Sequence, residues 1–567
     1  MELLDPFGLL SGATKLLERF GDEAYYVALC IRAGLVGPEM PHKVAQMLLS
    51  FERYGMLGGG MSLAGLRHGN QLALIDERGE LTYKELDRRV NSLATAWRRD
   101  GLKAGDGVAI LARNHRGFLE AFFAAAKCGS RIILFNTSFS GPQVREVAER
   151  EGVDLFVFDE EFSELVEGVD PQHGRWLSWA DSHPDAEDTL DALIESAPDQ
   201  APPKPEHAPK VVILTSGTTG TPKGAGRDVP WSLSPIGGLL SKVPFRAREV
   251  TELSVPMFHA LGFSQALLGV ALGSTLVLHR KFDPAETLNS LQEHGASAMV
   301  VVPVMLQRML GLDDSEWEGK EFPNLRIIFV SGSQLGEELA SRVTERFGKV
   351  IYNLYGSTEI AFATIATPDD LEAAPSTVGQ VVHGAVVKIL DDEGNDEVKT
   401  GESGRIFVGN SIQFEGYTGG GSKDEVGGLM ASGDVGHFDE KGRLFIDGRD
   451  DEMIVSGGEN VFPAEVEELL VKHDGVAEAA AIGVEDEDFG QRLKAFVVKS
   501  NGADLSEDDV KAYVKENLAR YKVPREVVFI DELPRNATGK VLKRELEESD
   551  DEDPDHEGTD DEQSDHK

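Results

Sequence analysis

Hydroxyl side chains, glycines and one lysine alternate in residues 215–224, which read Thr-Ser-Gly-Thr-Thr-Gly-Thr-Pro-Lys-Gly. The apolar, β-branched residues 211–214 come directly before this segment and predict a buried strand. Glycines let backbone N–H groups approach a ligand closely, while hydroxyls and an ammonium group add donors and positive charge. A strand followed by such a loop predicts a binding site for the phosphates of a nucleotide. The candidate ligands in the loop are Thr215, Ser216, Gly217, Thr218, Thr219, Gly220, Thr221 and Lys223.

The order of residues in this loop excludes a P-loop of the kinase and ATPase type. That motif places its lysine directly after a glycine, where a helix opens. Here Lys223 follows Pro222 and precedes Gly224, so no helix can begin there in that manner. A solvated linker rich in Ser, Thr and Gly is the alternative interpretation of the segment.

Further short motifs could supply the rest of a nucleotide site. Residues 355–359 read Tyr-Gly-Ser-Thr-Glu after the apolar run 350–354, so a ring, a hydroxyl and a carboxylate meet in a strand-to-loop turn. Residues 432–434 read Ser-Gly-Asp and predict a short acidic turn. Residues 448–451 read Gly-Arg-Asp-Asp, and residues 535–540 end in a lysine within a glycine-containing loop.

The length of the chain, 567 residues, predicts at least two domains with sizeable cores. No long apolar segment indicates a transmembrane helix, and the first residues do not resemble a secretory signal. The two cysteines, Cys30 and Cys128, offer neither a disulfide framework nor metal-ligand spacing, so we expect them in the core. We expect a cytoplasmic location.

A formal net charge of −42 argues against binding nucleic acid or an anionic membrane through a basic surface. An acidic surface fits a protein that must stay soluble in high salt, and we expect a halophilic enzyme. The plainer alternative places part of the excess in residues 545–565, which are nearly all acidic and are expected to be disordered.

The pattern of apolar residues predicts four regions along the chain. Residues 1–70 form a helical N-terminal extension, either an amphipathic segment for membrane or dimer contact or helices packed on the main body. Residues 71–449 alternate strands, for example 275–278 and 327–330, with helices, for example 83–98. This alternation predicts an α/β domain with a largely parallel sheet and, past residue 378, a β-rich subdomain. Residues 450–546 predict a small α+β domain, and residues 547–567 a disordered acidic tail.

These motifs, in this order, resemble the adenylate-forming superfamily of acyl-CoA synthetases, luciferases and peptide-synthetase adenylation domains. The resemblance covers about residues 71–547, and residues 256–259 (Pro-Met-Phe-His) and 454–463 make it look closest to medium- or long-chain fatty acyl-CoA synthetases. It implies that a carboxylate attacks the α-phosphate of ATP·Mg²⁺ to give an acyl-adenylate and pyrophosphate. The thiol of coenzyme A then displaces AMP.

The resemblance also assigns roles around the nucleotide. It implies that Lys223 and its loop hold the β- and γ-phosphates, that Thr358 contacts the α-phosphate, and that Glu359 holds Mg²⁺. The other nucleotide contacts that it implies are adenine on Tyr355 beside Gly356, Ser357 and Ser333, and the ribose on Asp434 with Arg449 close by.

On the acid and thiol side, the resemblance implies that Lys540 bridges the attacking carboxylate and the nucleotide during adenylation. Asp451 matches a hinge about which a mobile C-terminal domain rotates, and this rotation would bring Gly457 and Gly458 to the thiol channel. His259 matches an aromatic position near the acyl and thiol route, although a structural histidine is the alternative. The expected catalytic residues are Lys540, Thr358, Glu359 and His259.

The leading hypothesis is an ATP-dependent acyl-CoA ligase for a medium- or long-chain fatty acid, with ATP, Mg²⁺ and coenzyme A as cofactors. Alternatives are an aryl acid as substrate, a separate carrier protein as thiol donor, a luciferase-type oxygenase, or a non-catalytic nucleotide sensor. The expected partners are small molecules and not nucleic acid, with peripheral membrane contact and a homodimer left open.

Overall fold

The computed structural model describes residues 21–183, 186–215, 223–227, 233–391, 394, 396–412, 416–418, 420, 422–450, 454–456, 459–486, 490–518, 522–536 and 539–551. The chain divides into two compact units, the first comprising Met1–Ser432 and Gly436–Ile446 and the second Gly433–Val435 and Asp447–Lys567. Mixed α/β layers make up the large unit and a small α+β sheet the other, so the expected fold class is confirmed.

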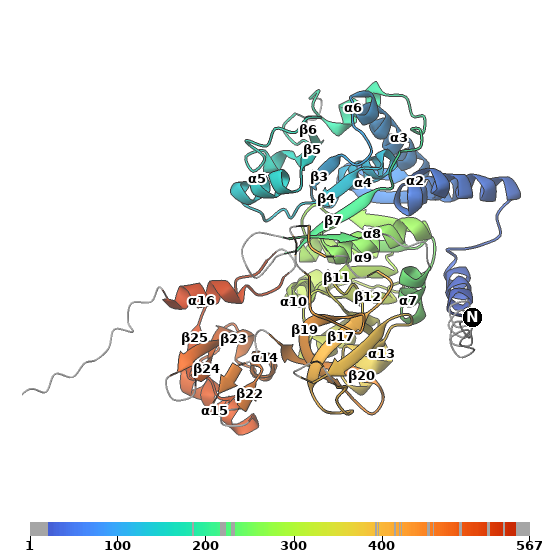
Figure 1. Cartoon of the computed structure of the whole chain (residues 1–567). Helices are drawn as coiled ribbons and strands as arrows, with labels where there is room; N and C mark the ends of the chain where they lie inside the picture. The colour runs from blue at the N-terminus through green and yellow to red at the C-terminus, as the bar shows by residue number, and fades with distance from the viewer. Residues whose placement is uncertain are drawn as a thin grey trace, which may run out of the picture. The chain divides into compact units, whose positions relative to one another are not determined.

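A six-stranded sheet lies in the first unit (Figure 1). Its order is β6 (Arg175–Trp179), β5 (Val153–Asp159), β3 (Gly107–Leu111), β4 (Arg131–Leu134), β7 (Lys210–Thr215) and β8 (Lys223–Arg227). Its neighbours are parallel except that β8 runs antiparallel to β7. Every residue of β3 is buried, as expected for a parallel strand covered on both faces. The β7–β8 pair carries both ends of the expected phosphate loop.

Several helices near this sheet begin or end at capping residues that suit those positions. The expected helix from Tyr83 is α3 (Tyr83–Arg99), which starts with a capping box between Thr82 and Glu85. α4 (Arg116–Cys128) ends at Gly129, whose φ of 76° is left-handed and favours glycine. The smaller helices of this layer are α5 (Gly141–Arg150), η1 (Glu160–Phe162) and α6 (Leu190–Ser196). Cys30 and Cys128 are buried and free, as expected.

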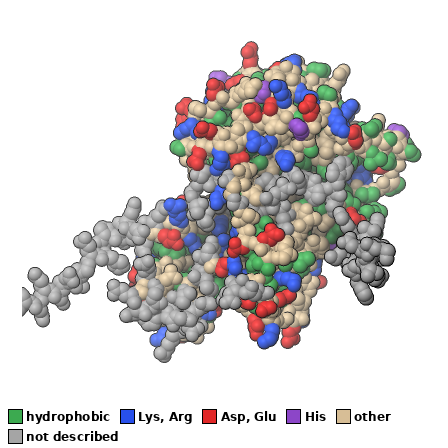
Figure 2. Space-filling view, in the orientation of Figure 1, with side chains coloured by type: hydrophobic (Ala, Val, Ile, Leu, Met, Phe, Trp, Pro, Cys, Tyr) green, Lys and Arg blue, Asp and Glu red, His purple; other side chains and the backbone are tan. Residues whose placement is uncertain are grey.

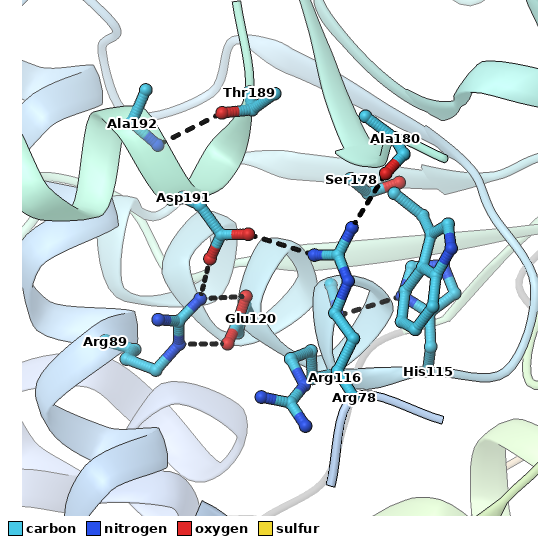
Figure 3. A network of polar contacts seen from close by, with 12 residues as sticks. Arg78, Arg89, His115, Arg116, Glu120, Ser178, Ala180, Thr189, Asp191 and Ala192 are labelled. Carbon is cyan, nitrogen blue, oxygen red and sulfur yellow. Dashed lines mark hydrogen bonds and ion pairs between the residues drawn. The ribbon is translucent and has the colours of Figure 1, made fainter. Parts of the chain in front are cut away.

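A partly buried polar network joins α3, α4 and α6 (Figure 3). Arg89 on α3 donates to Glu120 on α4, with 2.5 Å between Nε and Oε1, and to Asp191 on α6. Arg78 also reaches Asp191, at 2.9 Å. Burial lowers the pKa of Arg89, but the Glu120 and Asp191 carboxylates outweigh that effect, so the pKa lies above its usual value. The network fixes three helices around one guanidinium group.

The second sheet of the first unit has fourteen strands. Its parallel part, in order, is β13 (Ile351–Tyr355), β12 (Ile327–Val330), β11 (Ala298–Val301), β9 (Val250–Leu253), β10 (Thr275–Leu278) and β1 (Leu72–Asp76), and β2 (Gly79–Thr82) pairs antiparallel with β1. The helices associated with this part are α7 (Ser234–Lys242), α8 (Ala260–Leu272), α9 (Pro284–Glu293), α10 (Pro303–Leu310), α11 (Asp314–Trp317) and α12 (Glu337–Phe347).

Past β13 the sheet continues with short strands, as the turn-rich sequence predicts. The order is β14 (Thr364–Ala366), β15 (Gly379–Val381), β20 (Arg443–Arg449), β19 (Leu429–Phe438), β17 (Gly404–Gly409) and β16 (Val386–Leu390), with β18 (Glu425–Val426) on β19 and α13 (Pro368–Ala373) after β14. The pairs β13–β14, β14–β15, β15–β20 and β16–β17 are antiparallel. The β-rich part is therefore an extension of the parallel sheet.

The second unit contains a five-stranded sheet. Its elements are β21 (Ile454–Ser456), β22 (Glu459–Val461), α14 (Pro463–Val471), β23 (Val476–Asp486), β24 (Gly490–Lys499), α15 (Glu507–Asn517), β25 (Glu526–Phe529) and α16 (Lys543–Asp551). Ser506 caps α15 and exchanges hydrogen bonds with Asp509.

The acidic C-terminal segment differs from expectation. Helix α16 continues to Asp551, so disorder from residue 547 is wrong for residues 547–551. Leu546 is 4% exposed and packs with Ile482 and Phe496, which gives the helix an apolar anchor. Residues 552–567 lie outside the described part of the chain.

The N-terminal extension is helical in its described part. Residues 21–33 are helical, and α2 (Pro41–His68) bends at Gly55, where φ is 68°. Beyond the bend, α2 packs on α3, α4 and α8. Before it, Leu48 and Leu49 are each 64% exposed, and Figure 2 shows hydrophobic side chains gathered at this end of α2. Packing on the main body, one of the two alternatives, thus describes the second half of α2. Within the described residues, no helix is both long and apolar enough to cross a membrane.

Candidate active site

Candidate residues follow the carboxyl ends of neighbouring parallel strands. His259 comes after β9, Ser333 after β12, and residues 355–359 begin at the last residue of β13. Because β9, β11, β12 and β13 are parallel neighbours, their carboxyl ends share one edge of the sheet. Open α/β sheets bind ligands at this edge. The topology therefore gathers three motifs that are far apart in sequence.

The turn from Tyr355 to Glu359 is tightly built. A Cβ on Gly356 would lie 2.1 Å from the carbonyl oxygen of Ala361, so only glycine fits there. Ala361 itself adopts a left-handed φ of 59°. The side chain of Asn410 donates to the carbonyl oxygens of Ile360, at 2.5 Å, and of Phe362, at 2.9 Å. Such support fixes the direction in which the motif leaves β13.

The carboxylate of Glu359 is held by hydroxyl groups on both oxygens. Ser357 Oγ donates to Oε2 at 2.9 Å, and the phenol of Tyr417 donates to Oε1 at 3.0 Å. Burial raises the pKa of Tyr417 above its usual value, and the charge and hydrogen bond of Glu359 raise it further. Tyr417 therefore remains a neutral donor. Thr358, which lies between Ser357 and Glu359 in the sequence, is partly buried.

Tyr417 also contacts Lys223. Its ammonium nitrogen is 5.2 Å from the centroid of the tyrosine ring, within the range of a cation–π interaction. Lys223 opens β8, where it pairs with Thr215 of β7, so a strand and not a helix begins at this lysine, as expected. Tyr417 thus touches the lysine of one motif and faces the carboxylate of another.

Tyr417 is the residue that the motifs did not reveal. It lies 58 residues beyond Glu359, in a segment that none of the predicted motifs includes. The only signal available was an aromatic residue in a glycine-containing turn, a pattern that many structural tyrosines share.

His259 caps the start of α8 with an extended backbone. Its ring packs on Phe258, with 4.4 Å between centroids, and its Nε2 atom is buried without a hydrogen-bond partner among the described residues. Burial lowers the pKa of His259 to about 4, so the ring is neutral near pH 7. Asn114 supports this loop because it accepts from the Met257 amide at 2.8 Å and donates to the Val255 carbonyl at 2.8 Å.

The loop after β12 is joined to β13 through a side chain. Ser331 Oγ donates to the carbonyl oxygen of Leu354 at 2.9 Å, which places the Ser331–Ser333 loop beside the start of the Tyr355 motif. Ser333 is partly buried, and Gly332 has a left-handed φ of 98°. The structure therefore brings Ser333 and Tyr355 to neighbouring loops.

The second unit carries Asp434, Arg449 and Lys540. Arg449 Nη1 lies 3.4 Å from Asp434 Oδ1, and their side chains are 32% and 15% exposed. The Lys540 backbone donates to Asn536 Oδ1 at 2.9 Å, in a loop closed by the bridge between Arg535 and Val541. The Lys540 side chain is exposed.

Several expected site residues lie outside the described part of the chain. They are Ser216, Gly217, Thr218, Thr219, Gly220, Thr221, Asp451, Gly457 and Gly458. Their roles, like those of the other site residues, stay predictions.

The described residues suit magnesium that arrives with a nucleotide. No group of three or more His, Cys, Asp and Glu among them could hold a metal ion by itself. Mg²⁺ commonly binds through one or two carboxylates together with substrate phosphates. The Glu359 carboxylate fits that use because two hydroxyls hold it without neutralising its charge.

Comparison with known proteins identifies the family. The sequence profile of AMP-binding enzymes matches residues 64–418, and that of the AMP-binding enzyme C-terminal domain matches residues 465–540. The chain is 33% identical to indoleacetate–CoA ligase from Aromatoleum aromaticum over 85% of this chain and 96% of that protein. It is 30% identical to the fatty acid–acyl-carrier-protein ligase ScoC from Streptomyces coeruleorubidus over 84% of this chain and 92% of that protein.

A solved structure shows the same fold. It is o-succinylbenzoate CoA synthetase from Bacillus subtilis in complex with its acyl-adenylate intermediate, with a TM-score of 0.73 and 26% identity over 86% of this chain and 97% of that one. These relatives support closeness to fatty acyl-CoA synthetases only in part, because aryl acids are prominent among their named substrates. The expected ATP, Mg²⁺ and coenzyme A are confirmed as the cofactors of this class. The chain belongs to the AMP-binding enzyme family and is an acid–thiol ligase of the AMP-forming type.

Proposed function

We propose that this protein converts an apolar carboxylic acid into its coenzyme A thioester through an acyl-adenylate, and that aryl or arylalkyl acids are its preferred substrates. The observation that carries the proposal is the cluster of Glu359, Tyr417 and Lys223, in which one tyrosine contacts both a carboxylate and an ammonium group. A carboxylate for Mg²⁺ and a cation for phosphate are what a site for ATP requires.

The first half-reaction joins two anions. A carboxylate oxygen of the substrate attacks the α-phosphorus, and the bond between that phosphorus and the bridging oxygen breaks as pyrophosphate leaves. Lys223 holds the departing phosphates, Thr358 contacts the α-phosphate, and Lys540 brings positive charge to the attacking carboxylate. Magnesium, held by Glu359, supplies further charge neutralisation when bound.

The second half-reaction transfers the acyl group. The thiol of coenzyme A attacks the acyl carbon, the bond to the AMP oxygen breaks, and the thiol proton passes to solvent. Asp434 and Arg449 hold the ribose of the nucleotide, and Tyr355 lies on the adenine. Asp451 acts as a hinge, and Gly457 and Gly458 line the thiol route. These roles rest on the resemblance of the motifs.

The class of acid follows from the residues beyond His259. We infer that α8 and α10, which follow β9 and β11, line the acyl site. α8 contains no charged residue, and α10 contains one, Arg308. An apolar acyl group suits such a lining better than a second carboxylate does. The named substrates of two relatives, indoleacetate and o-succinylbenzoate, both carry an aromatic ring, and indoleacetate has no second carboxylate. We therefore place aryl acids ahead of medium- and long-chain fatty acids, which the sequence alone favoured.

A panel of acids tests this proposal. Aryl, arylalkyl and C6–C18 fatty acids are incubated with ATP, Mg²⁺ and coenzyme A, while pyrophosphate, AMP and thioester are measured. We expect thioester and AMP in equal amounts, with the highest kcat/KM for an aryl or arylalkyl acid. Highest kcat/KM for a fatty acid would contradict the substrate class, and no acid-dependent pyrophosphate release would contradict the activity.

Transfer to a carrier protein is a second candidate, because ScoC is named as a fatty acid–acyl-carrier-protein ligase. Coenzyme A, pantetheine and a carrier protein that bears a free phosphopantetheine thiol are offered in turn with the best acid. A thioester formed faster on the carrier protein than on coenzyme A would favour this second function.

A further inference from the structure

We propose that Tyr417 is a positioning residue that sets the spacing between the Glu359 carboxylate and the Lys223 ammonium group. The inference rests on the proposed function, in which these groups hold Mg²⁺ and the leaving phosphates. It adds to that function a residue from outside the motifs that carry the chemistry.

Strand pairing places the Tyr417 ring. Its backbone forms an antiparallel bridge with Ala225 of β8. Ala225 and Lys223 lie two residues apart, so their side chains share one face of that strand. A side chain opposite one residue of an antiparallel pair can reach the diagonal neighbour two residues away. Tyr417 therefore meets Lys223, with 5.2 Å between the nitrogen and the ring centroid.

The residue after Tyr417 anchors this arrangement to the body of the first unit. The Thr418 amide donates to the Gly224 carbonyl oxygen at 2.8 Å, and Thr418 Oγ1 donates to Glu151 Oε1 at 2.6 Å. Glu151 is 2% exposed and pairs with Arg150. A Cβ on Gly224 would lie 2.6 Å from Thr418 Oγ1, so glycine permits the close approach. Segment and strand are thus held together by backbone and side-chain contacts.

The chemistry of the contact with Glu359 favours a functional role. Among the described residues, the hydroxyls of Ser357 and Tyr417 donate to this carboxylate, and both are neutral. Neutral donors orient a carboxylate and leave its negative charge available to a cation, whereas a guanidinium or ammonium partner would neutralise it. Ligand carboxylates of metal sites are oriented by hydrogen bonds of this kind.

A purely structural role is the alternative. Tyr417 packs against a cluster that includes Ile360, Ala363 and Ile406, so its ring also fills space. Packing alone predicts that loss of the hydroxyl lowers stability and leaves metal dependence unchanged. A positioning role predicts instead that loss of the hydroxyl changes the metal dependence more than it changes stability. The two roles can be separated by removing the hydroxyl and the ring in turn.

Binding of α,β-methylene-ATP, whose α–β bridge cannot be cleaved, is measured by calorimetry across a Mg²⁺ series, without acid. In Tyr417→Phe the ring remains beside Lys223 and the hydrogen bond to Glu359 is lost. We expect the Mg²⁺ concentration for half-maximal binding to rise about tenfold or more. Affinity without Mg²⁺ should stay within about twofold of wild type, because the ring still faces the lysine. In Tyr417→Leu the Mg²⁺ concentration for half-maximal binding should rise, and the affinity without Mg²⁺ should fall.

Tyr83→Phe is the matched control. Tyr83 is a buried tyrosine whose hydroxyl donates to the Ser274 carbonyl oxygen at 2.6 Å, away from these motifs. The Tyr83→Phe protein should be less stable than wild type, and the Mg²⁺ dependence of its nucleotide binding should be unchanged. The same Mg²⁺ dependence in Tyr417→Phe as in wild type, or a Tyr417→Phe protein that does not fold, would overturn the proposal. Wild-type protein that binds no nucleotide would contradict the proposed function instead.

Discussion

Glu359 has one hydrogen-bond donor that its neighbours in sequence predict and one that they do not. The Tyr-Gly-Ser-Thr-Glu motif predicts the carboxylate and one of its donors, Ser357, since both belong to the same turn. The second donor, Tyr417, comes from a segment 58 residues away. Local chemistry is readable from a motif, whereas a contact made by folding is not.

The role expected of Lys540 gives the sharpest prediction for a single residue. In Lys540→Ala we expect adenylate formation to fall by about 100-fold or more, because the charge that joins the two anions is gone. Thioester formation from supplied acyl-adenylate should stay within about threefold of wild type, since this step needs no such bridge. Acid-dependent pyrophosphate release and single-turnover thioester formation measure the two steps.

A suitable control for that experiment is Lys511→Ala, which removes an ammonium group from the same unit on helix α15. Both half-reactions should be unaffected. Equal losses in both half-reactions of Lys540→Ala would contradict the division of labour.

His259 gives a prediction about pH. Its pKa of about 4 lies below the ordinary value because burial disfavours the charged ring. The ring is therefore neutral above about pH 5, and His259→Phe should change the adenylation rate by one constant factor between pH 6 and 8. A factor that varies with pH in this range would show that His259 titrates there.

The same pKa has a consequence for stability. The unfolded chain binds a proton at its ordinary pKa near 6.5, whereas the folded ring resists protonation, so stability falls as pH drops from about 6.5 to 4. The melting temperature of His259→Phe should fall less steeply than that of wild type over this interval.

At the level of elements, the strands and helices of the first unit were readable from apolar periodicity. Strands 275–278 and 327–330 have the expected bounds, and the helix from Tyr83 differs by one residue. Buried parallel strands and capped helices carry strong local signals. The helix of residues 543–551 was missed because its acidic composition conceals the packing of Leu546.

The Arg89 network gives a prediction at this scale. Glu120 is 1% exposed, and Glu120→Gln removes its charge while keeping its shape. Arg89 keeps its ion pair with Asp191 but loses its more deeply buried carboxylate partner, and we expect a loss of about 2 kcal/mol in the free energy of unfolding. Urea denaturation of the first unit measures this loss.

Asp100→Asn serves as the comparison. Its partner Arg99 lies 3.2 Å away, and the two side chains are 42% and 53% exposed. A surface pair of this kind contributes little, so the change should stay below about 0.5 kcal/mol. Similar losses in the two variants would contradict the importance of burial.

For the whole molecule, charge is the dominant property. A net charge of −42 repels itself within any compact fold, and salt shortens the screening length from about 10 Å at 0.1 M to about 3 Å at 1 M. Exposed ion pairs weaken with salt but contribute little. We therefore expect the melting temperature to rise as KCl increases from 0.1 to 2 M.

A non-electrolyte at matched osmolality separates screening from dehydration of the surface. It should raise the melting temperature less than KCl does. A melting temperature highest at low salt would contradict adaptation to high salt.

The sequence by itself determined the chemistry and the architecture in outline: a strand, a hydroxyl-rich loop and Lys223, then an ordered series of motifs on an α/β chain. These features are local, because backbone conformation and side-chain type within a few residues produce them. The tertiary structure decided that Tyr417 contacts both Lys223 and Glu359. That contact depends on the bridge to Ala225, and pairing between distant segments leaves no periodic pattern in the sequence.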